Sequence, residues 1–134
     1  MAGPLDGVRI IDLTTMASGP LATSILADQG ADVIKIEGPG RGDGLRTIGP
    51  SRGGMSAIFT SFNRNKRAMV LDLREPDGVA VLDRLVAGAD VLVQNFRPGA
   101  VERMGIDEAR YRILHPELIY VSVSGFGEKG PMAQ

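Results

Sequence analysis

Short apolar runs that alternate with helical patterns dominate the sequence of this 134-residue chain. Runs rich in β-branched residues predict buried strands, because such strands carry few polar positions. These runs cover residues 8–13, 32–37, 68–73, 90–94 and 118–123. Because they are apolar on both faces and helical segments separate them, the pattern predicts an α/β fold: a parallel sheet with helices on both faces.

The helical segments are predicted from apolar spacing and from the residues at their ends. The first begins at Ser18, a residue type that caps helices, and Gly30 is expected to stop it. Leu21, Ile25 and Leu26 fall on one face of this helix. Further helices are predicted from Pro76, over 107–114 and, as a single turn, over 56–62. The helix from Pro76 carries an apolar stripe of Val79, Leu82, Leu85 and Val86.

The loops after the strands are the candidate binding region, because ligands of parallel sheets bind at the carboxyl ends of strands. These loops span residues 14–20, 38–46, 71–75 and 95–99. The second belongs to a longer glycine-rich loop, 38–54, which follows the second strand and opens no helix, so it does not match a dinucleotide fingerprint. The fourth lies in VLVQNFRPGAVERMG (91–105), where a strand ends on an amide, an aromatic ring and an arginine.

Composition excludes several classes of protein and site. The chain has 43% hydrophobic and 23% charged residues, as in ordinary globular proteins, and we expect one domain at most. It has no apolar run long enough to span a membrane and no signal-peptide pattern. The absence of cysteine excludes disulfides and suits a cytoplasmic location, and a single histidine excludes a multi-histidine metal site. Aromatic residues make up only 4%, too few for a stacking surface that binds nucleic acid.

Charge is distributed unevenly along the chain. Between Arg41 and Arg74 there are seven basic and two acidic residues, a net charge of +5, whereas the rest of the chain carries −6. This segment predicts a docking place for an anionic small molecule. The alternative is a solvated basic loop.

Five ordered motifs cover nearly the whole chain, from Pro4 to Pro131: PLDGVRIIDLTTMASGP, LADQGADVIKIEGPGRGD, FNRNKRAMVLDLREPDG, ADVLVQNFRPGAVERMG and GFGEKGP. Together they resemble the N-terminal part of class III CoA transferases, the group that includes formyl-CoA and carnitine-CoA transferases and α-methylacyl-CoA racemases. The resemblance implies that residues 1–134 are the N-terminal CoA-binding portion of a Rossmann-like large domain. That domain would be incomplete here, with the small domain and the C-terminal part absent.

The resemblance also implies a set of residues that bind coenzyme A. The first loop contributes Met16, Ala17 and Ser18, the VLDLRE segment contributes Leu71 and Arg74, and the fourth loop and the helix after it contribute Asn95, Phe96, Arg97 and Arg103. Arginine forks suit phosphate oxygens, an aromatic face suits adenine or the pantetheine arm, and an amide suits polar edges.

Structural roles remain open for several of these residues. Phe96 is alternatively a plug for the core under its turn, Leu71 a core residue with its backbone near the ligand, and Arg97 a solvated side chain. Arg103 is alternatively an ion-pair partner of Glu102 or Asp107.

The catalytic residues implied by the resemblance are expected outside this chain. The family passes the acyl group through an aspartate in a Gly-Asp motif that would follow Gln134, so we assign no catalytic residue and interpret His115 as structural. The substrates implied are an acyl-CoA and a carboxylic acid, with a homodimer for the full-length protein and no metal. The alternatives are the racemase branch and a standalone, non-catalytic CoA-binding module. A chain without its C-terminal partners is also predicted to self-associate or to have a disordered tail after Val123.

Overall fold

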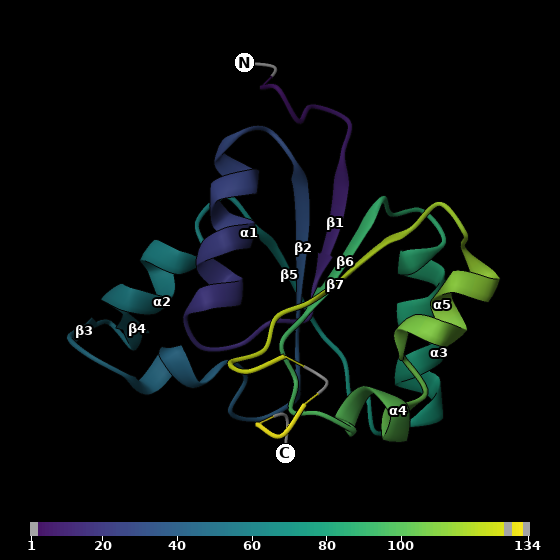
Figure 1. Ribbon diagram of the computed structural model, residues 1–134. Helices are drawn as coiled ribbons and strands as arrows, with labels where there is room; N and C mark the ends of the chain where they lie inside the picture. Colours follow the sequence, from purple (N-terminus) through teal and green to yellow (C-terminus); the bar gives the residue numbers. More distant parts are fainter. Residues whose placement is uncertain (1–2, 128–129, 133–134) are drawn as a thin grey trace.

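The computed structural model describes residues 3–127 and 130–132 (Figure 1). These residues form a parallel sheet of five strands in the order β5-β2-β1-β6-β7. The strands are β1 (Arg9–Asp12), β2 (Asp32–Glu37), β5 (Arg67–Val70), β6 (Val91–Gln94) and β7 (Ile119–Ser122). The chain adds β2 and β5 on one side of β1 and then β6 and β7 on the other. The strand order therefore reverses between β1 and β6, which is where parallel sheets of this kind open a crevice for ligands.

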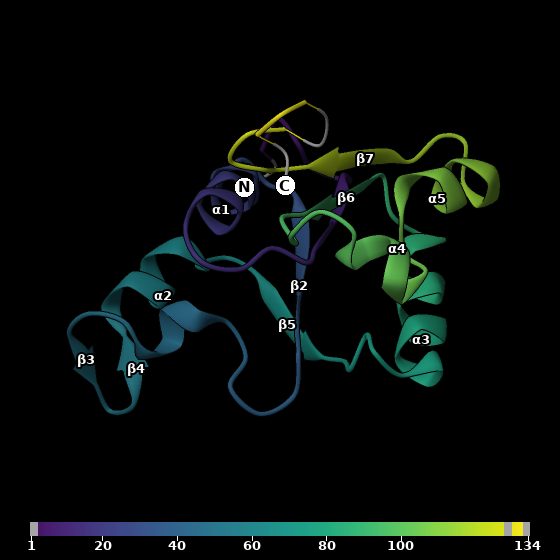
Figure 2. The same ribbon diagram turned by 60° about the horizontal axis from the view of Figure 1, so that its bottom comes forward.

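Helices cover both faces of the sheet, as predicted. Figures 1 and 2 show α1 and α2 on one side of the sheet and α3, α4 and α5 on the other. Their bounds are α1 (Ser18–Asp28), α2 (Ala57–Phe62), α3 (Pro76–Val86), α4 (Ala100–Met104) and α5 (Glu108–Leu114). The predicted α/β fold with a parallel, doubly covered sheet is confirmed.

Each face of the sheet has its own apolar core. Successive strand residues point to opposite faces, so Ile11 packs with Leu82 and Tyr111 under α3 and α5, while Ile10 packs with Ala27 under α1. The apolar stripe predicted for α3 supplies Leu82 and Val86 as fully buried side chains.

The first helix differs from its prediction at its start and on its packed face. Ala17 is the N-cap and Ser18 is the first helical residue, with no side-chain cap bond. Of the predicted apolar face, Leu21 and Ile25 are 39% and 46% exposed, whereas Leu26 is half-buried and packs against the core under α1. The buried face instead carries small residues: Gly19, Pro20, Thr23, Ser24 and Ala27. Close approach explains this choice, because a Cβ added at Gly19 would lie 2.4 Å from the Thr14 side chain. The predicted stop is confirmed at Gly30, which follows the C-cap with φ of 104°.

Two other predictions need correction. The strands β5 and β7 were expected to be buried, but β5 is exposed along its length and β7 is at most half-buried, because both are edge strands. The segment 38–54 is not a plain loop. It contains the 3-10 helix η1 (Gly44–Thr47) and, with residues that follow it, a hairpin of β3 (Ser51–Arg52) and β4 (Met55–Ser56).

The C-terminal predictions stay untested. Residues 1–2, 128–129 and 133–134 lie outside the described residues, and these include two positions of the GFGEKGP motif and part of the tail after Val123.

Candidate functional site

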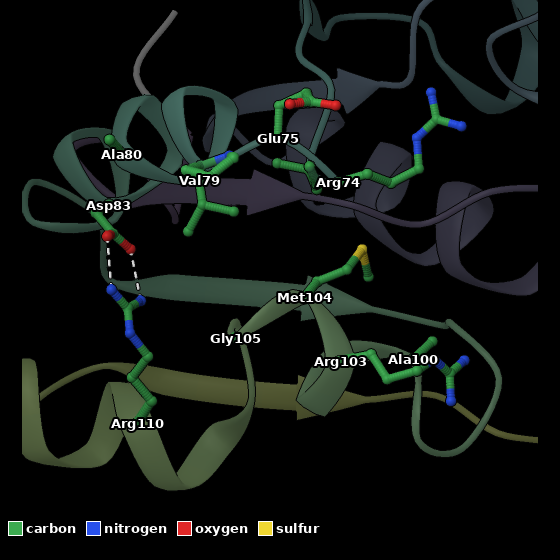
Figure 3. Close-up of a pocket in the computed structure, with 12 residues that line it drawn as sticks. Arg74, Glu75, Val79, Ala80, Asp83, Ala100, Arg103, Met104, Gly105 and Arg110 are labelled. Carbon is green, nitrogen blue, oxygen red and sulfur yellow. Dashed lines mark hydrogen bonds and ion pairs between the residues drawn. The ribbon is translucent and has the colours of Figure 1, made fainter.

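A two-part groove runs along the carboxyl ends of the strands. The larger part, about 730 Å³, lies between α3, from its start to Asp83, and α4 together with Arg110 of α5 (Figure 3). The smaller part, about 300 Å³, lies over the ends of β1, β2, β5 and β6. The two parts share Leu73, Arg74 and Met104 in their walls and therefore adjoin each other, and we call them together the edge groove.

The edge groove brings together four of the residues predicted from the sequence. Leu71, Arg74 and Phe96 line the smaller part, and Arg74 and Arg103 line the larger part. Phe96 and Leu71 are half-buried and also pack against the core under α3. The core contacts that were the structural alternative for each residue are therefore present. These four residues come from two separate loops and α4, which the sheet places at one edge.

The arginines of the groove have different partners. Arg74 is 77% exposed and pairs with Asp72, with its Nη2 2.6 Å from Asp72 Oδ2. This pairing, together with the Arg74 backbone N–H, lowers the pKa of Asp72 to about 2. Arg103 is exposed, and within the described part of the chain it forms no ion pair with Glu102 or Asp107. Its guanidinium is therefore free to bind an anion.

The far end of the groove is closed by an ion pair between two helices. Arg110 on α5 donates two hydrogen bonds of 2.7 Å to Asp83 on α3, as the dashed lines of Figure 3 show. Arg110 and the Tyr111 hydroxyl together lower the pKa of the Asp83 carboxyl. No local sequence pattern indicates this pair, because its two residues lie on different helices.

Asn95 and Arg97 lie outside the edge groove. The Asn95 side chain bonds to the backbone of Thr15, accepting from its N–H at 2.9 Å and donating to its carbonyl oxygen at 2.8 Å. It therefore ties the loop after β1 to the loop after β6, across the point where the strand order reverses. Arg97 is exposed, as its structural alternative predicts, and it lines a neighbouring pocket with Phe96.

The first loop carries the remaining predicted residues. Met16, Ala17 and Ser18 are exposed and do not line either part of the edge groove. Met16 has φ of 65°, a left-handed conformation that is uncommon for a residue with a side chain. Its N–H donates to Asp43 Oδ1 at 3.0 Å, which connects the loop after β1 to the loop after β2.

Beneath these loops lies a buried ion pair that was not predicted from the sequence. The Lys66 ammonium donates to Asp12 Oδ2 at 2.9 Å, and both side chains are at most 1% exposed. Thr14 and Thr23 also donate to this carboxylate. Burial alone would raise the pKa of Asp12, but Lys66, Lys35 and the two threonines outweigh it and lower the pKa. Burial lowers the pKa of Lys66, although Asp12 acts in the opposite direction. The surroundings of the pair therefore favour the charged form of Asp12 but disfavour the charged form of Lys66.

A second buried pair adjoins the first. Lys35 Nζ lies 2.9 Å from Asp43 Oδ2, and both side chains are at most 1% exposed. Asp43 Oδ2 makes this ion contact without a hydrogen bond, whereas Oδ1 accepts from Met16 and Leu45. The signal for both pairs was present in the sequence, because Asp12 and Lys35 are charged residues inside otherwise apolar strands.

Most of the predicted basic segment is neutralised within the chain. Five of its seven basic residues form ion pairs with carboxylates: Arg46 with Glu37, Arg64 with Asp28, Lys66 with Asp12, Arg67 with Asp32 and Arg74 with Asp72. Arg46 also lies over the Phe59 ring at 3.8 Å. Sequence distance hid these pairs, since most of the acidic partners lie outside the segment. The excess of positive charge around this segment is therefore smaller in the folded chain than it is along the sequence.

The described residues contain no group of three or more His, Cys, Asp or Glu side chains placed to hold a metal ion. His115 stacks on Tyr111 with ring centroids 6.3 Å apart, in agreement with its structural interpretation. In the part of the chain that the structure describes, no helix is long and apolar enough to cross a membrane.

Comparison with known proteins gives one family. Residues 5–134 match CoA-transferase family III. The chain is 47% identical to acetyl-CoA:oxalate CoA-transferase of Acetobacter aceti, over 98% of this chain and 34% of the relative. It is 44% identical to succinate–glutarate CoA-transferase of Agrobacterium fabrum, over 97% of this chain and 34% of the relative. A crystal structure of a CAIB/BAIF family protein from Brucella suis has a TM-score of 0.93 at 40% identity, over 99% of this chain and 36% of that one. The chain thus spans about a third of the length of the proteins it matches.

Proposed function

This chain belongs to CoA-transferase family III, and on that premise we propose that it is the CoA-binding N-terminal portion of an acyl-CoA:carboxylate CoA-transferase. The observation that carries the proposal is the edge groove, which gathers Leu71, Arg74, Phe96 and Arg103 from separate parts of the chain. Its position at the carboxyl ends of the strands is the usual ligand position of a parallel sheet.

The groove offers the types of contact that CoA needs. Arg103 supplies an unpaired guanidinium for phosphate oxygens, which arginine binds through two parallel hydrogen bonds. Phe96 and Leu71 provide an apolar surface for adenine or the pantetheine arm.

Arg74 has a smaller role in this proposal. Its positive charge is already paired with Asp72. We therefore assign to Arg74 the role of a flat side chain in the wall where the two parts of the edge groove meet, and not that of a free cation. Asn95, together with Met16, Ala17 and Ser18, shapes the loop at the reversal point, and Arg97 stays a predicted contact at the outer rim.

The reaction itself is proposed for the whole protein. In this scheme CoA passes between two carboxylic acids through an aspartyl intermediate, whose aspartate follows residue 134, in a homodimer located in the cytoplasm. The two relatives above are named for oxalate, succinate and glutarate, so short dicarboxylates are the acids to test first. Their names also support transfer over the racemase alternative.

Calorimetric titration of CoA into the chain tests the proposal. We expect the wild type to bind CoA. Arg103→Ala should bind it at least tenfold more weakly, which corresponds to a loss of about 1.4 kcal/mol of binding free energy. Arg84→Ala is the matched control, since Arg84 is an exposed arginine on α3 that does not line the groove. No CoA binding by the wild type, or equal losses in the two variants, would overturn the proposal.

A further inference from the structure

We propose that Asp43 is a positioning residue for CoA binding: it holds the loop after β1 in the shape that the ligand meets. This inference rests on the proposed function, because the loop after β1 borders the smaller part of the edge groove through Thr15. Asp43 is fully buried and ends the motif LADQGADVIKIEGPGRGD, but it is not among the residues that the resemblance assigns to CoA binding, and it does not line the edge groove. The geometry around it points to this role.

Three consecutive residues of the loop are fixed by three different polar side chains. Lys35 Nζ donates to the Thr14 carbonyl oxygen at 2.8 Å. Asn95 bonds to both backbone groups of Thr15. Asp43 Oδ1 accepts from the Met16 N–H at 3.0 Å. The loop at the reversal point is therefore held from β2, from the β6 loop and from the β2 loop at the same time.

Met16 is the residue that most needs such a support. Its φ of 65° is a conformation that costs a side-chain-bearing residue on the order of 1 kcal/mol and persists only where the surroundings impose it. The side chain of Met16 also lies against Gly44, where an added Cβ would be 2.7 Å from Sδ. The Asp43–Gly44 dipeptide thus contacts both the backbone and the side chain of Met16.

Asp43 is itself held rigidly. Its N–H donates to Glu37 Oε2 at 2.8 Å, its Oδ1 also accepts from the Leu45 N–H at the start of η1, and its Oδ2 faces Lys35 Nζ. These contacts hold the Asp43 carboxylate in a single orientation. The hydrogen bond that it accepts therefore holds the Met16 N–H in a single orientation as well. Fixing a binding loop before the ligand arrives lowers the ordering cost of binding.

A purely stabilising role for the buried pair predicts something different. In that case, substitutions at Asp43 would lower the free energy of unfolding but leave the CoA affinity of the folded protein unchanged. The positioning role predicts that the affinity follows the Met16 hydrogen bond. Asp43→Ala removes the acceptor and Asp43→Asn keeps Oδ1, so the two variants separate these roles.

The experiment measures CoA affinity by calorimetry and exchange of the Met16 amide by NMR, at a temperature where each variant is folded. For Asp43→Ala we expect faster exchange at Met16 and at least tenfold weaker CoA binding. For Asp43→Asn we expect a protected Met16 amide and an affinity within about threefold of the wild type. Asp32→Ala is the control and leaves both readouts unchanged, since Asp32 is a partly exposed carboxylate at the start of β2 that pairs with Arg9 and Arg67.

The outcomes separate this inference from the proposed function. A wild-type chain that does not bind CoA refutes the proposed function. A wild-type chain that binds CoA, with Asp43→Ala folded and binding as tightly, overturns the positioning role. If Asp43→Ala does not fold, Asp43→Asn provides the test. An Asp43→Asn chain with a protected Met16 amide but weak CoA binding would also overturn the positioning role.

Discussion

Replacing Asp12 with asparagine tests the importance of the buried Asp12–Lys66 pair. Asparagine has nearly the same shape, so the change removes charge without creating a cavity. Its oxygen retains the bonds from Thr14, but its NH₂ group then faces two donors, the Thr23 hydroxyl and the Lys66 ammonium. Lys66 is left charged and buried, with the Pro20 carbonyl and the Asn63 side chain as its remaining acceptors.

The expected cost is large for a chain of this size. Breaking a buried ion pair by removing one partner costs about 3–5 kcal/mol, against a total stability of about 5–15 kcal/mol for a domain. With an unfolding entropy of about 2 cal/mol/K per residue, the melting temperature falls by about 10 °C or more.

The pH dependence has a defined sign. The pKa of Asp12 is lower in the folded state than its ordinary value of 3.8, so its carboxylate stabilises the fold above pH 3.8. This contribution is lost as the pH falls from 3.8 through the folded-state pKa. The difference between the wild type and Asp12→Asn should therefore shrink in that window.

Urea unfolding followed by circular dichroism at neutral pH and in acid measures both effects. Asp32→Asn is the control, because Asp32 is 36% exposed and its ion pairs are expected to contribute less than about 1 kcal/mol. The reasoning is refuted if Asp12→Asn loses no more stability than Asp32→Asn.

Two further predictions concern the edge groove. Gly78→Ala places a Cβ 2.0 Å from the Asp72 carbonyl oxygen. We expect urea unfolding to show a loss of about 1–3 kcal/mol in the free energy of unfolding, together with weaker CoA binding. Gly88→Ala is the control and should have little effect, because its added Cβ would have its nearest contact at 3.6 Å. A Gly78→Ala chain as stable as the wild type would contradict this. Arg74→Ala should return the pKa of Asp72 from about 2 toward 3.8, and an NMR titration of the Asp72 carboxyl that stays near 2 would show that Arg74 is not the cause.

Local patterns predicted the fold because strands and helices depend on residues close in sequence. The DVIKIE strand has the predicted bounds, and the helix from Pro76 begins where its proline fits the first turn. The packed face predicted for α1 was wrong at Leu21 and Ile25. The close approach of Gly19 to Thr14 selects small residues on the buried face, and apolar spacing does not indicate this. Edge positions of β5 and β7 depend on strand order, which no single segment encodes.

The candidate site was only partly predictable for the same reason. Leu71, Phe96 and Arg103 stand in motifs that the resemblance identified, and the sheet brings them to one groove. The pairs of Lys66 with Asp12 and of Lys35 with Asp43 join side chains that lie on different loops and strands. Their partners became visible only in three dimensions, although a lysine inside an apolar strand was a signal that such a partner exists.

A CoA titration followed by two-dimensional amide NMR tests the central claim most directly, because it locates the ligand on the chain. The account predicts shifts for residues 14–18, 71–75 and 95–105, which surround the carboxyl edge of the sheet. Amides at the opposite edge, at 30–32, 88–90 and 115–118, should stay unchanged. A spectrum that CoA leaves unaltered, or shifts confined to the β3–β4 hairpin or the opposite edge, would contradict the account.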